Sequence, residues 1–237
     1  MSSNTTISPY LHLQMILFTL CFILATQIWG FRARRNAQIS VVSRRFGYGM
    51  LVLYLIYVAY FLYPSNFSWE ISLPLQVCDL LIPISAIALI NSNRQARSLQ
   101  YFCAFTLAGQ AILTPAGNQD PASFRFWLYW IIHAGIYSSA LFDLTVKRYT
   151  PKISDLFQVL IINIIYAILI VPLNIAFNWN YGFLGNSKPN APTVIDLLGP
   201  WPQRIFIILL IAITSQILMY LPWAVYQVCV GKKQGQN

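Results

Sequence analysis

A thiol and a carboxyl are neighbours in an apolar stretch of this chain, where Cys78 and Asp79 close the run LPLQVCD. An ionised carboxyl inside a bilayer costs about 2.5 to 3.5 kcal/mol on insertion scales, so it normally has a partner and often a function. An imidazole, His133, occurs in another apolar stretch. Because the thiolate is the nucleophile of cysteine chemistry and a nearby base can generate it, Cys78, Asp79 and His133 are the candidate catalytic residues.

The directions of these side chains limit how they can combine. Successive residues of a helix point about 100° apart, so Cys78 and Asp79 cannot project from the same face. Either His133 lies between them, or Asp79 serves another helix and has Gln76, three residues earlier, as its same-face neighbour. The alternative for Cys78 is the role of a small buried hydrophobe. The alternative for the polar residues is interhelical hydrogen bonding, worth about 0.6 kcal/mol on average.

Composition identifies the class of protein that positions these residues. Hydrophobic residues make up 57% of the chain and charged residues 9%, and the mean hydropathy is +0.59; soluble domains are about 25% charged. We therefore expect an all-α, polytopic membrane protein with one domain, a seven-transmembrane-helix bundle. About 20 apolar residues cross about 30 Å of hydrocarbon, and the stretches that qualify are 12–31, 46–63, 71–90, 99–116, 124–146, 156–177 and 205–230.

The basic residues predict the orientation of this bundle. Of the 15 lysine and arginine residues, 12 fall in the first, third and fifth loops and the C-terminal tail, which leaves Arg125, Lys188 and Arg204 for the other side. Cytoplasmic loops hold the excess of basic residues, so we expect the N-terminus outside and the C-terminus inside a cell membrane, either a plasma membrane or a bacterial inner membrane. Topology thus explains the net charge of +9 and argues against a nucleic-acid partner.

Polar side chains at helical spacing predict an interior that opens toward the outer side. Tyr129, His133 and Tyr137 follow one face of the fifth stretch. With a rise of about 1.5 Å per residue, Cys78 and His133 lie about 10 Å and about 13 Å below the outer boundary. In a bundle surrounded by lipid such faces turn inward. The candidate substrate-binding residues are Gln76, Gln110, Tyr137, Asn174, Asn178 and Tyr181.

The outer segment 178–202 is unusual in composition. It holds four prolines and three glycines, which prevent a long helix, yet its aromatic and leucine residues are too apolar for a free linker. We expect a packed lid that dips into the membrane interface. The alternative is a merely interfacial connector.

Three separated motifs give the chain a resemblance to a known family. LPLQVCD in the third stretch, His133 in the fifth, and NYGFL, KP and DLLGPWP before the last stretch resemble the YwaF-type bacterial integral membrane proteins. That group is similar to the eukaryotic transmembrane protein 164 family of lipid acyltransferases. The resemblance covers residues 46–230 and implies acyl transfer in which Cys78 carries the acyl group and His133 acts as base. Gln76 stands where many members have His, which argues against a mechanism with a second imidazole beside Cys78.

The leading hypothesis is therefore a phospholipid acyltransferase that uses no cofactor. A phospholipid of the outer leaflet enters the polar interior, and the Cys78 thiolate takes its acyl chain as a thioester. An acceptor lipid hydroxyl then removes the chain. Gln110, Asn174 or backbone N–H groups would stabilise the oxyanion of each step.

The main alternative is a non-catalytic binder or transporter of a small molecule or lipid, in which Pro83, Pro172 and Pro222 interrupt three spans. A threonine nucleophile, Thr106 or Thr114, paired with the same imidazole is a further option. A retinal protein needs a lysine within a span, and all five lysines lie outside the predicted spans. A metal site needs several converging ligands, so with two histidines in the chain no metal is expected. The sequence carries no signal for an oligomeric state.

Overall fold

The computed structural model describes residues 7–115, 120–186 and 194–234, and these residues form helices and loops without a β-strand. The prediction of an all-helical protein is confirmed. Two short 3-10 helices, η1 (Tyr181–Phe183) and η2 (Val194–Leu198), lie between α7 and α8. The α-helices are α1 (Pro9–Arg35), α2 (Ile39–Leu62), α3 (Val77–Asn91), α4 (Arg94–Thr106), α5 (Gln110–Leu113), α6 (Phe124–Thr145), α7 (Ile153–Phe177) and α8 (Gln203–Gln234).

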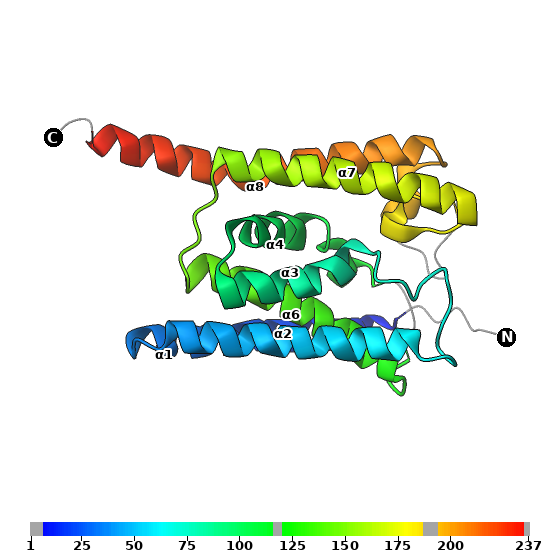
Figure 1. Ribbon diagram of the computed structural model, residues 1–237, viewed down its shortest axis with the longest axis horizontal. Coiled ribbons are helices and arrows are strands. Elements are labelled where there is room, and N and C mark those ends of the chain that lie inside the picture. The colour runs from blue at the N-terminus through cyan, green and yellow to red at the C-terminus, as the bar shows by residue number, and fades with distance from the viewer. Residues whose placement is uncertain (1–6, 116–119, 187–193, 235–237) are drawn as a thin grey trace.

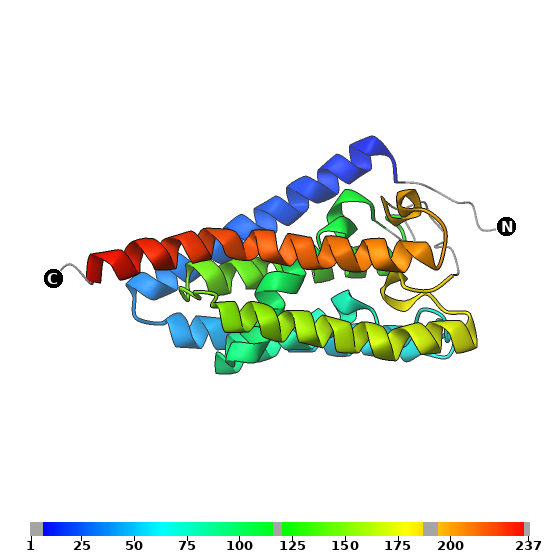
Figure 2. The same ribbon diagram turned by 90° about the horizontal axis from the view of Figure 1, so that it is seen from above.

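The long helices pack in three layers that follow one common direction (Figure 1). Helices α3, α4 and α6 form the middle layer, with α1 and α2 on one side and α7 and α8 on the other. Contacts of α2 with α3, α1 with α6, and α4 with α7 join the layers. Helix α1 begins at one end of the long axis and α8 ends at the opposite end, as Figure 2 also shows. The two 3-10 helices lie at the end where α1 begins.

Four helices are long and apolar enough to cross a membrane, namely α1, α2, α7 and the part Gln203–Gln227 of α8. Each has 24 to 27 residues, more than the roughly 20 that a bilayer core requires. Their outward faces carry large apolar side chains, such as Ile161 and Ile168 on α7 and Leu210 on α8, all more than half exposed. Apolar faces of this extent suit lipid rather than water.

Helix α6 runs through the middle of the bundle. Most of its residues are buried, including His133, Tyr137 and Asp143, because it packs against α1, α3 and α4. Since protein rather than lipid surrounds this helix, it can carry polar groups on several faces. Helix α6 is thus the element that holds the imidazole in the interior.

Helix α3 begins at Val77, so the prediction of a helix from residue 71 is wrong at its start. Pro74 disfavours a helical conformation at the residue before it and cannot donate a backbone hydrogen bond. Asp79, the third residue of the helix, accepts the backbone N–H of Gln76 through Oδ2 at 3.1 Å and so caps the new start. With 15 residues, α3 is about 22 Å long, and Cys78 lies in its first turn rather than within a span.

The prediction of one helix over 99–116 is also wrong, because the α-helix in this part of the chain ends at Thr106. The backbone hydrogen bonds change there: the N–H of Ala108 bonds to the carbonyl of Cys103, five residues back, and that of Ala111 bonds to Ala108, three residues back. Neither bond belongs to an α-helix. The four-residue helix α5 follows the break.

Side chains from α1 and α6 hold α5 in place. The hydroxyl of Tyr129 donates to the carbonyl of Ala111 at 2.7 Å, and the ring Nε2 of His12 donates to the carbonyl of Ile112 at 2.7 Å. These two bonds satisfy carbonyls that an uninterrupted helix would have paired internally. They fix the position of Gln110, the first residue of α5.

Candidate functional site

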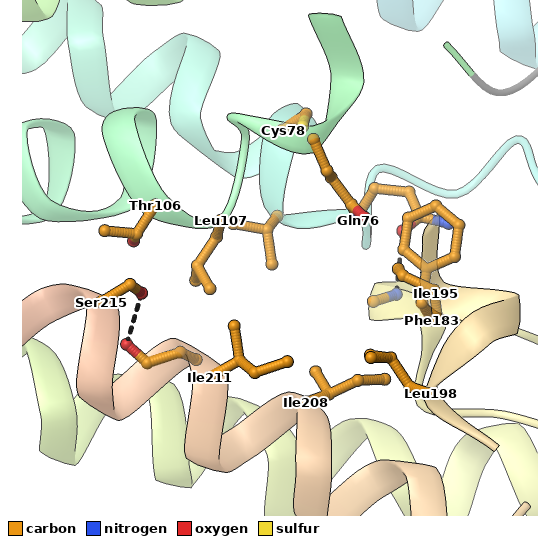
Figure 3. Close-up of a pocket in the computed structure, with 14 residues that line it drawn as sticks. Gln76, Cys78, Thr106, Leu107, Phe183, Ile195, Leu198, Ile208, Ile211 and Ser215 are labelled. Carbon is orange, nitrogen blue, oxygen red and sulfur yellow. Dashed lines mark hydrogen bonds between the residues drawn. The ribbon is translucent and has the colours of Figure 1, made fainter. Parts of the chain in front are cut away.

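A cavity of about 210 Å³ lies among α3, α4, α5, α8 and the two 3-10 helices (Figure 3). Its polar lining comes from Gln76, Cys78, Thr106, Gln110 and Ser215. The other lining residues are Val77, Leu107, Gly182, Phe183, Ile195, Leu198, Ile208, Ile211 and Ala212. The thiol of Cys78 therefore borders a mostly apolar space that contains a few hydrogen-bonding groups.

The first turn of α3 presents Cys78 to this cavity. The N–H groups of a first turn have no acceptor within the helix and form the positive end of its dipole, which stabilises negative charge nearby. By contrast, Cys103 is buried and its Sγ lies 3.7 Å from Oδ1 of Asn163, whereas Cys21 and Cys229 are exposed. Among the described residues, Cys78 is the cysteine that lines the cavity.

The carboxyl of Asp79 has partners within the chain. It is buried, accepts the backbone N–H of Gln76, and faces the hydroxyl of Tyr57 on α2. The side chain of Gln76 in turn accepts the N–H of Gly182 through Oε1 at 2.8 Å, which leaves the donors of this amide on Nε2. Asp79 thus fixes the start of α3 and the position of Gln76, and is a positioning residue in this arrangement.

His133 is buried on α6 and its ring has a defined orientation. Its Nδ1 lies 2.7 Å from the carbonyl oxygen of Tyr129, and since a carbonyl only accepts, Nδ1 carries the proton. The neutral ring then has its lone pair on Nε2. The ring packs on that of Tyr129, with centroids 4.2 Å apart. Within the described residues no hydrogen bond joins this ring to the thiol of Cys78.

Tyr137 is a second buried polar residue on this face of α6. It lies one turn beyond His133, on the same face. Its hydroxyl is buried, has no hydrogen-bond partner in the described structure, and is an electrostatic neighbour of the Cys78 thiol. The ring contacts Phe105 of α4, with centroids 6.3 Å apart. Of the predicted substrate-binding residues, Gln76 and Gln110 line the cavity, whereas Tyr137 does not.

Asn174 and Tyr181 fasten the lid instead of lining the cavity. The side chain of Asn174 donates to the carbonyl of Tyr181 and accepts its N–H, both at 2.9 Å. The Tyr181 hydroxyl donates to the carbonyl of Trp69 at 2.8 Å; burial raises the pKa of this hydroxyl to about 12, so it stays a donor at neutral pH. Asn178 is an exposed residue that ends α7 with a left-handed backbone (φ 54°).

The described parts of segment 178–202 pack against the bundle, as expected of a lid. Within the segment, Gly185 approaches Trp179 so closely that a Cβ at Gly185 would lie 1.9 Å from the carbonyl oxygen of Trp179. The indole of Trp201 donates to the carbonyl of Leu184 at 3.3 Å, and the guanidinium of Arg204 donates to the carbonyl of Gly185. Residues of both 3-10 helices form one wall of the cavity (Figure 3).

Sequence reasoning missed most of the cavity walls. Ile208, Ile211 and Ser215 lie at helical spacing on the last predicted stretch, but an apolar stripe there equally suits lipid contact. For a metal, the described residues offer no group of three or more His, Cys, Asp or Glu side chains that could hold an ion.

The long apolar helices and their lipid-type surfaces define the class: a multi-pass integral membrane protein. The particular family follows from comparison with known families, since the TMEM164 family matches residues 2–220. The chain therefore belongs to the TMEM164 family, which confirms the resemblance noted from its motifs. Comparison with curated proteins and with solved structures found no match.

Proposed function

We propose that the protein is a phospholipid acyltransferase that carries the acyl group on Cys78 as a thioester. The observation that supports this most is the position of the thiol, in the first turn of α3 and at the wall of a mostly apolar cavity. An apolar space suits an acyl chain, and the turn that carries the thiol favours a thiolate. Membership of the TMEM164 family agrees with a lipid substrate.

The reaction proceeds in two balanced steps. The base takes the Cys78 proton and the sulfur attacks the ester carbonyl, so an S–C bond forms, the ester C–O bond breaks, and the leaving lysolipid oxygen receives that proton from the base. In the second step the hydroxyl of an acceptor lipid attacks the thioester, its proton goes to the base, and the thiolate leaves. No oxidant, reductant or cofactor is consumed.

His133 is the base in this scheme, acting through Nε2. Because no hydrogen bond joins its ring to Cys78 in the described structure, the proton passes through an intermediate group. The Tyr137 hydroxyl suits this role, as it neighbours the thiol, lacks another partner and lies one turn from His133. Catalytic hydrogen bonds often tighten only when substrate is bound.

Gln76 and Gln110 are the proposed donors to the oxyanion. Both line the cavity, and Oε1 of Gln76 is already used as an acceptor, so its Nε2 is the donor that remains. The earlier candidate Asn174 is engaged by Tyr181 at both ends of its amide and is the weaker choice. A well-placed donor contributes about 3 to 4 kcal/mol in other enzymes.

The proposed topology has seven crossings, with the N-terminus outside. The shorter helices α3 and α4 lie in the middle layer between the long helices, and α5 continues the chain beyond α4. In this orientation the cavity lies toward the outer leaflet, and the basic loops lie inside. Cysteine accessibility at the ends of α1 and α8, measured in sealed vesicles, tests this orientation.

Transfer by purified protein in vesicles tests the activity, with a phospholipid labelled in its acyl chain as donor and a lysophospholipid as acceptor. Cys78→Ala is expected to reduce transfer to background, and His133→Gln to slow it by about 10²- to 10⁴-fold. Cys103→Ala, a buried cysteine outside the cavity, is the matched control and should retain transfer. Undiminished transfer by Cys78→Ala would rule the scheme out.

A lipid binder without catalysis is the second candidate function. The missing hydrogen bond between His133 and Cys78 is the observation that favours it. A binder would hold phospholipid equally well as wild type and as Cys78→Ser, and neither protein would transfer an acyl chain.

A further inference from the structure

Arg204 is a buried cation whose charge the described part of the chain does not balance. It is the second residue of α8 and is 5% exposed. The guanidinium stays protonated at any physiological pH, and burying an unpaired charge is costly. Among the described residues it forms no ion pair. Its Nε has no hydrogen-bond partner, and one Nη donates to the carbonyl of Gly185.

Position relates this cation to the cavity. Arg204 precedes Ile208, Ile211 and Ser215 by four, seven and eleven residues, so all four side chains follow one face of α8. The three later residues line the cavity. Arg204 lies one turn, or about 6 Å, nearer the start of the helix. The Gly185 carbonyl that it contacts belongs to the segment whose η1 residues also line the cavity.

Two backbone N–H groups at the start of α8, including that of Arg204 itself, already have acceptors within the chain. The N–H of Arg204 bonds to the carbonyl of Pro200 at 3.0 Å, and that of Ile205 bonds to Pro202 at 3.1 Å. The guanidinium is therefore the group available to an anion. Its planar fork matches the oxygen atoms of a phosphate, and charge-assisted hydrogen bonds of this kind are strong.

We infer that Arg204 binds the phosphate of a glycerophospholipid whose acyl chain occupies the cavity beside Cys78. This inference rests on the proposed function, since it names the headgroup feature that the same site recognises. A lipid is favoured over a free phosphate ion because the cavity that begins one helical turn from Arg204 is mostly apolar. The phosphate would then lie at the lid end and the acyl ester nearer the thiol.

A purely structural role for Arg204 predicts a different outcome. If its function were only to hold the lid through Gly185, its loss would weaken every ligand of the cavity equally. A phosphate-binding role predicts a selective loss. Two ligands that differ only in a phosphate therefore separate the two roles.

The experiment measures equilibrium binding of palmitoyl lysophosphatidic acid and of monopalmitoylglycerol by calorimetry in detergent micelles. All proteins carry Cys78→Ala, so that the result does not depend on acyl transfer. With Arg204 intact, the phosphate-bearing lipid is expected to bind at least about tenfold more tightly. Arg204→Gln should remove that preference and leave the affinity for monopalmitoylglycerol within about twofold.

Arg125→Gln is the matched control, because this cation lies at the start of α6 with its guanidinium over the ring of Phe61 and does not line the cavity. It should retain the preference. Equal weakening of both lipids by Arg204→Gln, or equal affinity of the two lipids for the intact site, would overturn the inference. If inorganic phosphate binds as tightly as the lysolipid, the inference that the bound phosphate belongs to a lipid is wrong. Because every protein in this binding experiment carries Cys78→Ala, its result does not depend on whether the wild type transfers acyl chains.

Discussion

The two ends of this bundle differ in how their charged groups are paired. At the end away from the lid, Arg94, Arg97, Asp143, Lys147 and Asp155 form a charged network in which each group has an opposite charge within 4 Å. At the lid end, a buried arginine has no described ion pair, and a thiol and a tyrosine hydroxyl have no described hydrogen bond.

The charged network joins helices of the middle layer to one another and to α7. Asp143 on α6 lies 2.7 Å from Arg97 on α4 and 3.4 Å from Lys147, whose Nζ also donates to the carbonyl of Ala88 on α3 at 2.9 Å. Asp155 at the start of α7 accepts two bonds from Arg94.

Tyr149 reinforces this network from the loop between α6 and α7. Its hydroxyl donates to Asp155 at 3.0 Å. Burial, followed by the charge of that carboxyl, raises the pKa of Tyr149 well above its usual range, so the hydroxyl remains a donor.

This difference between the two ends suggests that one end mainly stabilises the fold and the other mainly serves function. Ion pairs formed within the chain specify how helices pack and need no ligand. Polar groups left without partners lower stability and become useful only when a ligand completes them. We therefore propose that ligand binds at the lid end, and we expect substitutions at the two ends to affect different measurements.

The largest expected effect on stability is at Asp143. Asp143→Ala leaves Arg97 and Lys147, whose side chains are 18% and 10% exposed, without a carboxylate, and breaking a buried pair costs about 3 to 5 kcal/mol of unfolding free energy. Unfolding by sodium dodecyl sulfate, followed by circular dichroism, measures it. Glu70→Ala, at an exposed carboxyl that has no ion pair among the described residues, should change stability by less than about 0.5 kcal/mol. Equal stability of the two variants would remove the contrast between the ends.

An intermediate effect is expected at Gly185, where the lid meets its own backbone. In Gly185→Ala the new Cβ overlaps the Trp179 carbonyl oxygen, so the lid backbone must shift, at a cost of about 1 to 3 kcal/mol. Lipid binding should fall more than stability does, because the shifted segment forms a cavity wall. Gly49→Ala has open space around its Cβ and should leave binding unchanged. Normal lipid affinity in Gly185→Ala would show that the lid does not shape the site.

The smallest effect is expected at Arg94. Its side chain is 47% exposed, against 18% for Arg97, and Asp155 keeps its bonds from Tyr149 and from the N–H of Lys152 when Arg94 is lost. Arg94→Gln should therefore cost about 1 kcal/mol or less. The same unfolding assay compares it with Arg97→Gln, which should cost more. If Arg94→Gln lowers the free energy of unfolding more than Arg97→Gln does, burial does not determine how much each ion pair contributes to stability.

The sequence predicted the helical membrane class and the family, because apolar content and motifs can be recognised without knowing how the helices pack. It failed where the chain is apolar but not helical. The residues before Val77 count as part of a span by hydropathy, although Pro74 and the Asp79 cap begin the helix later. The break after Thr106 depends on side chains of Tyr129 and His12 that reach it from distant parts of the chain.

The candidate site was predicted only in part for the same reason. The position of Cys78 beside a cavity follows from the lid and from α8, whose contacts no local pattern reveals. Asn174 and Tyr181 look like free polar groups in the sequence, but each is the other's partner in the structure.

The most direct test of the central claim is peptide mass spectrometry of the protein, quenched during turnover with a phospholipid donor. The account predicts an acyl adduct on Cys78 that hydroxylamine removes and that acceptor lysophospholipid discharges. Steady acyl transfer with Cys78 unmodified throughout would contradict it.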